Sequence, residues 1–109
     1  MLEDLFGNSA LVKALDFFLE NRFWDYTKKD VAQNSGISRT QLYKFWNSLE
    51  SHGIVKGTRK IGGTTLYKVN MDSRTVKLLE ALSREVADRI NEKIIAEEVR
   101  GDFKQARLP

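Results

Sequence analysis

One stretch of the chain, TKKDVAQNSGISRTQLYKFW, constrains the fold more than any other, because it predicts two short helices around a sharp turn. Thr27 and Asp30 have the spacing of a capping box, in which two residues cap a helix N-terminus reciprocally. Ser38 and Gln41 repeat that spacing at the start of a second helix. Between the two boxes lies Gly36, the residue type that best adopts a positive φ at a corner.

The apolar residues of this stretch have the spacing that lets two crossed helices share one small core. They are Val31, Ala32, Ile37, Leu42 and Phe45. Ala32 and Gly36 are small where the helices must approach closely. This spacing resembles the helix-turn-helix of DNA-binding proteins, in which the second helix enters the major groove.

The composition limits the kinds of protein that the chain can be. Its 109 residues suffice for one domain, and 41% hydrophobic with 30% charged residues favour folding over disorder. The chain has no cysteine and one histidine, which removes disulfides, thiolate metal sites and cysteine nucleophiles. No apolar run approaches the roughly 20 residues of a membrane span, and the acidic N-terminus has no signal-peptide pattern. We therefore expect a soluble cytoplasmic protein that is not an enzyme and holds no metal or cofactor.

Positive charge is concentrated on the segment that carries the two short helices. Residues 28–68 hold eight basic and two acidic residues, a net charge of +6. The residues before this segment sum to −3, and those after it sum to 0. Such asymmetry is typical of a protein that binds a polyanion. An ordinary solvated basic surface is the alternative that charge alone leaves open.

The residues before the paired helices predict a further helix and an aromatic link. From Ser9 to Asn21, the apolar residues cover a broad arc of a helical wheel. Phe17 lies outside that arc, so it is predicted to cover a partner chain, with partial exposure as the alternative. Phe23, Trp24 and Tyr26 follow, and their rings are predicted to seal the bottom of the core.

The second helix of the pair is predicted to run from about Arg39 to His52 and to carry the DNA-reading face. Its buried stripe would be Leu42, Phe45, Trp46 and Leu49, at positions i, i+3, i+4 and i+7. The predicted base readers on the outward face are Arg39, Thr40, Gln41 and Lys44. Arginine can grip guanine bidentately, and glutamine can do the same to adenine. The predicted phosphate contacts are Thr27, Lys28 and Tyr43, and Ser38 also belongs to the predicted DNA-binding residues.

A β-hairpin is predicted after Gly53, which is expected to end the second helix in the left-handed conformation. Residues 54–56 and 66–69 read as two antiparallel strands, with Gly62 and Gly63 in the turn. Arg59 and Lys60 stand near the tip, and Thr64 stands opposite them. A basic hairpin directly after a recognition helix predicts a wing that reaches the adjacent minor groove or its phosphates.

Residues 26–70 resemble the winged-helix regulators of archaea and bacteria, a set that includes the ArsR-like and MarR-like repressors. The phrases VAQNSGIS, LESHGIV and LYKVN stand where that family carries its turn, its helix end and its last strand. The resemblance implies sequence-specific binding of duplex DNA, usually as a homodimer at a near-palindromic site. The chain departs from ArsR-like metal sensors, which bind metal through cysteine and histidine clusters, because His52 is its one histidine.

A long helix is predicted from Asp72 or Ser73 to about Val99, with Gly101 ending it. Its length of roughly 40 Å exceeds the roughly 25–30 Å expected for the unit before it. The residues expected to project beyond that unit and to form a dimer interface are Val86, Ile90, Ile94 and Ile95. An unpaired apolar stripe in water is unfavourable, so it predicts pairing with a second copy. A helix that folds back or breaks near Ala87 is the alternative.

These expectations define a mainly α fold with a small β-hairpin, a winged helix-turn-helix with a long C-terminal dimerisation helix. Residues 1–71 would bind DNA, residues 72–100 would dimerise, and residues 101–109 would form a flexible tail. The expected function is that of a homodimeric transcription regulator that binds double-stranded DNA. A protein-binding winged helix and a plasmid or viral replication or partition factor are the alternatives. A small-molecule effector is neither predicted nor excluded.

Overall fold

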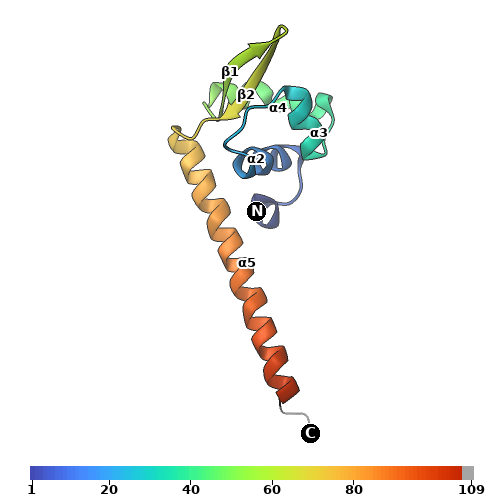
Figure 1. Cartoon of the computed structure of the whole chain (residues 1–109), viewed down its shortest axis with the longest axis vertical. Helices are drawn as coiled ribbons and strands as arrows, with labels where there is room; N and C mark the ends of the chain where they lie inside the picture. Colours follow the sequence, from blue (N-terminus) through green and yellow to red (C-terminus); the bar gives the residue numbers. More distant parts are fainter. Residues whose placement is uncertain (107–109) are drawn as a thin grey trace.

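Five helices and one hairpin account for most of the chain (Figure 1). The computed structural model describes the backbone of residues 1–106 and the side chains of residues 1–99. The elements are α1 (Leu2–Phe6), α2 (Ala10–Glu20), α3 (Lys28–Ser35), α4 (Arg39–Ser51), β1 (Val55–Ile61), β2 (Thr64–Val69) and α5 (Arg74–Ala106). The first four helices and the hairpin form one body, the winged unit, and α5 runs past it as a rod. The expected fold class is confirmed.

Helices α3 and α4 begin at the two predicted capping boxes. Thr27 Oγ1 accepts a hydrogen bond from the Asp30 amide at 3.1 Å, and Asp30 Oδ2 accepts from the Thr27 amide at 3.3 Å. Ser38 and Gln41 make the same pair of bonds at 3.1 and 3.0 Å. Gly36 ends α3 with φ of 73°, the left-handed conformation that the corner requires. The local signals of the helix-turn-helix are therefore satisfied as the sequence predicts.

The predicted stripe of α4 forms the centre of the core. Leu42, Trp46 and Leu49 are buried, and Phe45 is partly buried against them. After α4, Gly53 has φ of 68° and the chain turns into the hairpin. Because this stripe is buried, the opposite face of α4, which carries its polar residues, faces solvent.

The hairpin is longer than predicted and is tied to the rest of the winged unit. Gly62 and Gly63 have φ of 56° and 80°, as a two-residue turn between twisted strands requires. A register shift between Gly57 and Arg59 marks a β-bulge in β1. Beside β2, the backbones of Tyr26 and Tyr67 exchange hydrogen bonds of 2.8 and 2.7 Å. The link before α3 therefore acts as a short third strand.

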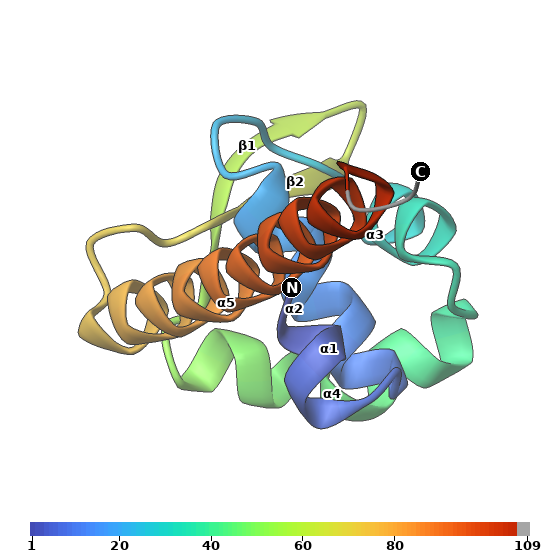
Figure 2. The same ribbon diagram turned by 90° about the horizontal axis from the view of Figure 1, so that it is seen from below.

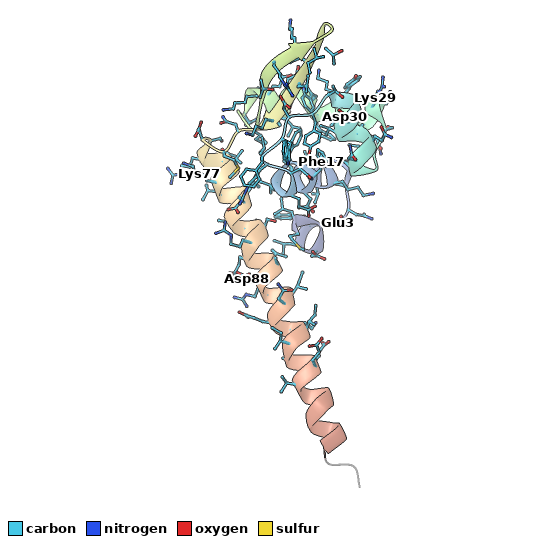
Figure 3. All side chains as sticks on the ribbon, in the orientation of Figure 1. Glu3, Phe17, Lys29, Asp30, Lys77 and Asp88 are labelled. Atoms are coloured by element: carbon cyan, nitrogen blue, oxygen red, sulfur yellow. The ribbon has the colours of Figure 1, made fainter. Side chains whose placement is uncertain are left out.

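Phe17 lies inside the winged unit (Figure 3), so its predicted role in covering a partner chain is wrong. Its side chain is 9% exposed, and its ring centroid lies 4.8 Å from that of Tyr26 and 5.7 Å from that of Phe18. The prediction failed because it treated α2 as packed on one side. In the structure α2 is the central helix, in contact with α1, α3, α4 and β2.

The aromatic link is also corrected in part. Tyr26 packs on the core, but Phe23 and Trp24 are 71% and 69% exposed. Pairing with β2 holds Tyr26 inward, whereas Phe23 and Trp24 lie in the turn and bend that follow α2. Phe23 and Trp24 therefore do not seal the core.

Helix α1 is an element that the sequence analysis did not predict. The buried carboxylate of Asp16 caps it, accepting hydrogen bonds from the amides of Leu2 at 2.8 Å and Glu3 at 3.0 Å. Leu2 is 1% exposed and joins the core, while Leu5 and Phe6 are 54% and 60% exposed. In two perpendicular views α1 lies beside α5 (Figures 1 and 2), and the two helices are in contact.

Helix α5 begins as predicted and continues further than predicted. Ser73 Oγ accepts from the Val76 amide at 3.3 Å, as a capping residue does. The helix is continuous through Ala87, and it continues through Gly101, which was wrongly expected to end it. A glycine inside a helix costs about 1 kcal/mol relative to alanine and does not by itself stop the helix. Of the expected flexible tail, residues 101–106 are helical and residues 107–109 lie outside the described residues.

The far part of α5 has no cover from the winged unit. The molecule measures 69 × 28 × 22 Å, and α5 extends along the long axis well beyond the winged unit (Figure 1). Val86 and Ile90 are half-buried, but all nine residues from 91 to 99 are exposed. Ile94 and Ile95 are 48% and 59% exposed. No helix within residues 1–106 is long and apolar enough to cross a membrane.

Candidate nucleic-acid interface

An open groove of about 510 Å³ lies between the start of α3, the first turns of α4 and strand β2. Its walls bring together parts of the chain that are distant in sequence. The lining residues are Thr27, Lys28, Lys29, Arg39, Tyr43, Thr64, Thr65 and Tyr67. Five of them, Thr27, Lys28, Arg39, Tyr43 and Thr64, belong to the DNA-binding set predicted from the sequence.

The chemistry of the groove suits a phosphate backbone. Lys28, Lys29 and Arg39 supply three cations, and threonine and tyrosine hydroxyls supply hydrogen-bond donors. The residues that line it, all within the described part of the chain, include no carboxylate. A polyanion in the groove would therefore meet cations and hydroxyl donors and no acidic side chain.

Lys28 is held in place by three aromatic rings. Its Nζ lies 5.1 Å from the centroid of Trp46, and 5.6 Å from those of Tyr43 and Tyr67. Each distance is within the range of cation–π attraction. Trp46 is 2% exposed, so its ring belongs to the core, and Lys28 lies over it while lining the groove. Attraction to the three rings restricts the Lys28 side chain, which lowers the entropy that it would lose on binding an anion.

The outward face of α4 continues beyond the groove. Thr40, Gln41 and Lys44 are exposed there, as predicted for residues that read base edges. Gln41 has a second role, because its Oε1 accepts from the Ser38 amide in the capping box. A bidentate contact with adenine uses both the oxygen and the nitrogen of the amide. Gln41 can make that contact only if it releases the cap, which the sequence analysis did not consider.

The two cations of the wing face in opposite directions. In the register of the hairpin, Lys60 pairs with Thr65, which lines the groove, whereas Arg59 pairs with Leu66 on the other face. There Arg59 meets Asp25: Arg59 Nε lies 2.9 Å from Asp25 Oδ2, and Arg59 Nη2 lies 3.2 Å from Asp25 Oδ1. Hydrogen bonds from Arg59 and Thr58 hold the pKa of the Asp25 carboxyl below its usual range.

Arg59 thus differs from the other predicted DNA-binding cations. Within residues 1–99, none of Lys28, Arg39, Lys44 and Lys60 lies within ion-pair distance of a carboxylate. The structure therefore brings most of the predicted set to one face and leaves Arg59 on the other side of the wing.

Sequence reasoning missed several members of this surface. Lys29, Thr65 and Tyr67 line the groove, and strand alternation could have found the last two, since alternate residues of β2 face the same side. No local signal pointed to Asp25, because its contact with Arg59 depends on the tertiary fold.

A metal site is not evident in the described side chains, where no group of three or more histidine, cysteine or acidic residues is close enough to hold an ion. His52 lies at the end of α4, and its Nδ1 is 2.8 Å from the Ser48 carbonyl oxygen. That position is favourable for a histidine because the negative end of the helix dipole lies there.

Comparison with known proteins gives matches in structure alone. No protein-family model matches the sequence, and no curated protein sequence matches it either. Among solved structures, the homodimeric winged helix-turn-helix DNA-binding domain of Mb0332 from Mycobacterium bovis, a possible ArsR-family transcriptional regulator, is 24% identical to the chain. The match covers 77% of this chain and 72% of that one, with a TM-score of 0.56.

Two further structures extend the comparison to nearly the whole chain. MepR, a transcription regulator of the multidrug efflux pump MepA of Staphylococcus aureus, is 14% identical, with coverage of 96% and 77% and a TM-score of 0.66. ZitR of Lactococcus lactis in complex with DNA is 15% identical, with coverage of 86% and 70% and a TM-score of 0.54. The chain therefore has the winged helix-turn-helix fold of these transcription regulators.

Proposed function

We propose that the protein is a homodimeric transcription regulator that binds double-stranded DNA in a sequence-specific manner. The observation that carries this proposal is the groove in which Lys28, Lys29 and Arg39 converge beside the exposed face of α4. Neighbours with this fold support it, because the Mb0332 domain is described as DNA-binding and ZitR as bound to DNA.

In the proposed complex α4 enters the major groove and the hairpin lies on the adjacent minor groove or backbone. Arg39, Thr40, Gln41 and Lys44 face the base edges, since they lie on the exposed side of the first turns of α4. The phosphate contacts come from the groove, through Thr27, Lys28, Tyr43 and Thr64, with Ser38 beside them. Lys60 supplies a cation from the wing.

Dimerisation in this proposal uses α5. Val86, Ile90, Ile94 and Ile95 supply the apolar stripe, and the last two are exposed in a single chain. Exposed Leu5 and Phe6 on α1 extend the apolar surface beside α5. An apolar surface of this kind is typical of an interface between subunits. Two copies joined there would present two α4 helices to one duplex.

The test is a filter-binding titration with genomic duplex fragments over a range of salt concentrations. We expect the association constant to fall steeply with salt, because each phosphate contact releases bound counterions. Replacing Lys29 with alanine removes one lysine from each protomer of the dimer, so the slope of log K against log [salt] should become shallower by about 1.8. Lys77→Ala is a matched control, because Lys77 is an exposed lysine that projects from the opposite side of the molecule (Figure 3).

Sequence specificity is tested separately, by selection of bound duplexes from a random pool. Arg39→Ala should relax the preference at one base pair in each half-site, at a cost of about 1–3 kcal/mol. A wild-type protein that binds no duplex at low salt would contradict the proposal and favour a protein partner for this face. Genomic fragments recovered by pull-down would distinguish a regulator from a replication or partition factor by their location.

A further inference from the structure

Asp25 is joined to strand β1 of the wing by three hydrogen bonds. Its Oδ2 accepts from the Thr58 hydroxyl at 2.6 Å and from Arg59 Nε at 2.9 Å, and its Oδ1 accepts from Arg59 Nη2 at 3.2 Å. Two donors of one guanidinium on two oxygens of one carboxylate make a geometrically specific pair. The Asp25 side chain is 18% exposed, while that of Arg59 is 61% exposed.

The backbone explains why these groups meet. Tyr26 pairs with Tyr67, so the residue before it in the link faces the side of the hairpin opposite to the Tyr67 side chain. The bulge in β1 then brings both Thr58 and Arg59 to Asp25 on that side. Without the extra residue of the bulge, two successive residues of a strand would face opposite sides.

The pair changes the charge that the wing offers to DNA. Asp25 neutralises Arg59, and Arg59 lies on the face of the hairpin away from the groove. Lys60 shares a face with Thr65 and has no carboxylate within ion-pair distance among residues 1–99. A phosphate that approached the remaining N–H groups of Arg59 would meet the negative charge of Asp25 beside them, which opposes the contact.

From these contacts we infer that Asp25 is a positioning residue that keeps Arg59 off the DNA, so that Lys60 is the cation through which the wing contacts phosphate. This role of Asp25 rests on the proposed DNA binding, and it adds that Asp25 restrains Arg59. Asp25 thereby sets how many phosphates each protomer neutralises, and hence how steeply binding depends on salt. The arginine nearest the wing tip is then a structural residue.

The test measures the salt dependence of duplex binding for four proteins: wild type, Asp25→Asn, Arg59→Ala and the double variant. Arg59→Ala should leave the slope of log K against log [salt] unchanged. Asp25→Asn should release Arg59 in both protomers of the dimer and steepen the slope by about 1.8, which is two additional phosphate contacts per complex. Between 50 and 200 mM salt this is an extra loss of affinity of about twelvefold.

The double variant distinguishes a phosphate contact made by Arg59 from a general effect of net charge. It lacks both members of the pair, so it has the same net charge as wild type and should return to the wild-type slope. A slope made shallower by about 1.8 in Arg59→Ala alone would show that Arg59 already contacts phosphate in both protomers and would overturn the inference. An unchanged slope in Asp25→Asn would also overturn it.

A measurement without DNA keeps this result distinct from the proposed function. In the free protein, exchange of the Arg59 Nε–H proton with solvent, followed by NMR, should be slow in wild type and fast in Asp25→Asn. Equal exchange rates would contradict the restraint even if all four proteins bound DNA. If wild type bound no duplex, the proposed function would fail along with the DNA part of this inference. The exchange rates would still report whether Asp25 holds Arg59.

Discussion

The winged unit and the far part of α5 differ in how their apolar side chains are covered. In the winged unit Phe18, Leu42 and Trp46 are at most 2% exposed, covered by elements of the same chain. In α5 every residue from 91 to 99 is exposed, including three large apolar ones. The first region has a complete core in one protomer. The second has a helix whose apolar residues gain little from folding unless a second chain covers them.

The largest effect expected from this comparison comes from removing equivalent volume in the two regions. Leu42→Ala should lower the free energy of unfolding by about 2–5 kcal/mol, because it leaves a cavity in a closed core. Ile95→Ala should have an effect that varies with protein concentration, because its side chain is exposed in a single chain and would be covered in the proposed dimer. Thermal denaturation at several protein concentrations measures both. If the melting temperatures of Ile95→Ala and wild type differed by the same amount at every protein concentration, the far part of α5 would not depend on a second chain for its cover.

Charge placed on the exposed stripe should separate the subunits and leave the winged unit folded. The double substitution Ile94→Asp, Ile95→Asp puts two carboxylates where the proposed interface buries two isoleucines. Sedimentation equilibrium should then give the mass of a monomer. Circular dichroism should show that the winged unit remains folded. Leu78→Asp is the matched control, an equally exposed leucine of α5 outside the predicted stripe. Dimers in the double variant would show that the interface lies elsewhere.

Removing a helix cap should have a smaller effect, and its consequences should differ between the two regions. Ser38 caps α4 and Ser73 caps α5, each through its hydroxyl oxygen. Alanine at either position should cost about 0.5–2 kcal/mol of stability, measured by urea denaturation. Only Ser38→Ala should also weaken duplex binding, because it loosens the turn that presents Arg39 and Gln41. Equal loss of binding in both variants would point to global stability instead.

The smallest effect expected is the pH dependence of the wing. The pKa of Asp25 in the folded protein is lowered by hydrogen bonds from Arg59 and Thr58, so the pair stabilises the wing above the unfolded pKa of about 3.9. That contribution should be lost as the pH falls from about 4 through the lowered pKa. The protection factors of the amides in residues 58–61, which correct for the intrinsic pH dependence of exchange, should therefore fall at acid pH in wild type more than in Asp25→Asn. The same fall in both proteins would assign the change to other carboxyl groups.

The helix-turn-helix could be read from the sequence because its signals are local. The capping pairs at Thr27 and Ser38, the corner at Gly36 and the stripe of α4 each depend on residues a few positions apart. The groove was predicted in part for the same reason, since five of its residues follow from the motif and the turn.

The errors concern residues whose environment depends on distant parts of the chain. Phe17 was assigned to a partner because α1 and the central place of α2 could not be seen in a helical wheel. Helix α1 has no capping side chain of its own, and Asp16 supplies its cap from α2. Arg59 has the position in the sequence that is expected of a wing cation, but it contacts Asp25, which lies 34 residues earlier in the chain. In each case a tertiary contact overrode a sound local pattern.

The contrasting burial of the two tryptophans provides a built-in optical probe. Trp24 is 69% exposed, whereas Trp46 is 2% exposed and lies beneath the Lys28 ammonium. Acrylamide should quench the fluorescence of the first and leave that of the second largely intact. In a Trp24→Phe variant the remaining tryptophan emission would come from Trp46, next to the Lys28 ammonium that lines the groove, so occupation of the groove by a ligand could be followed without any attached dye.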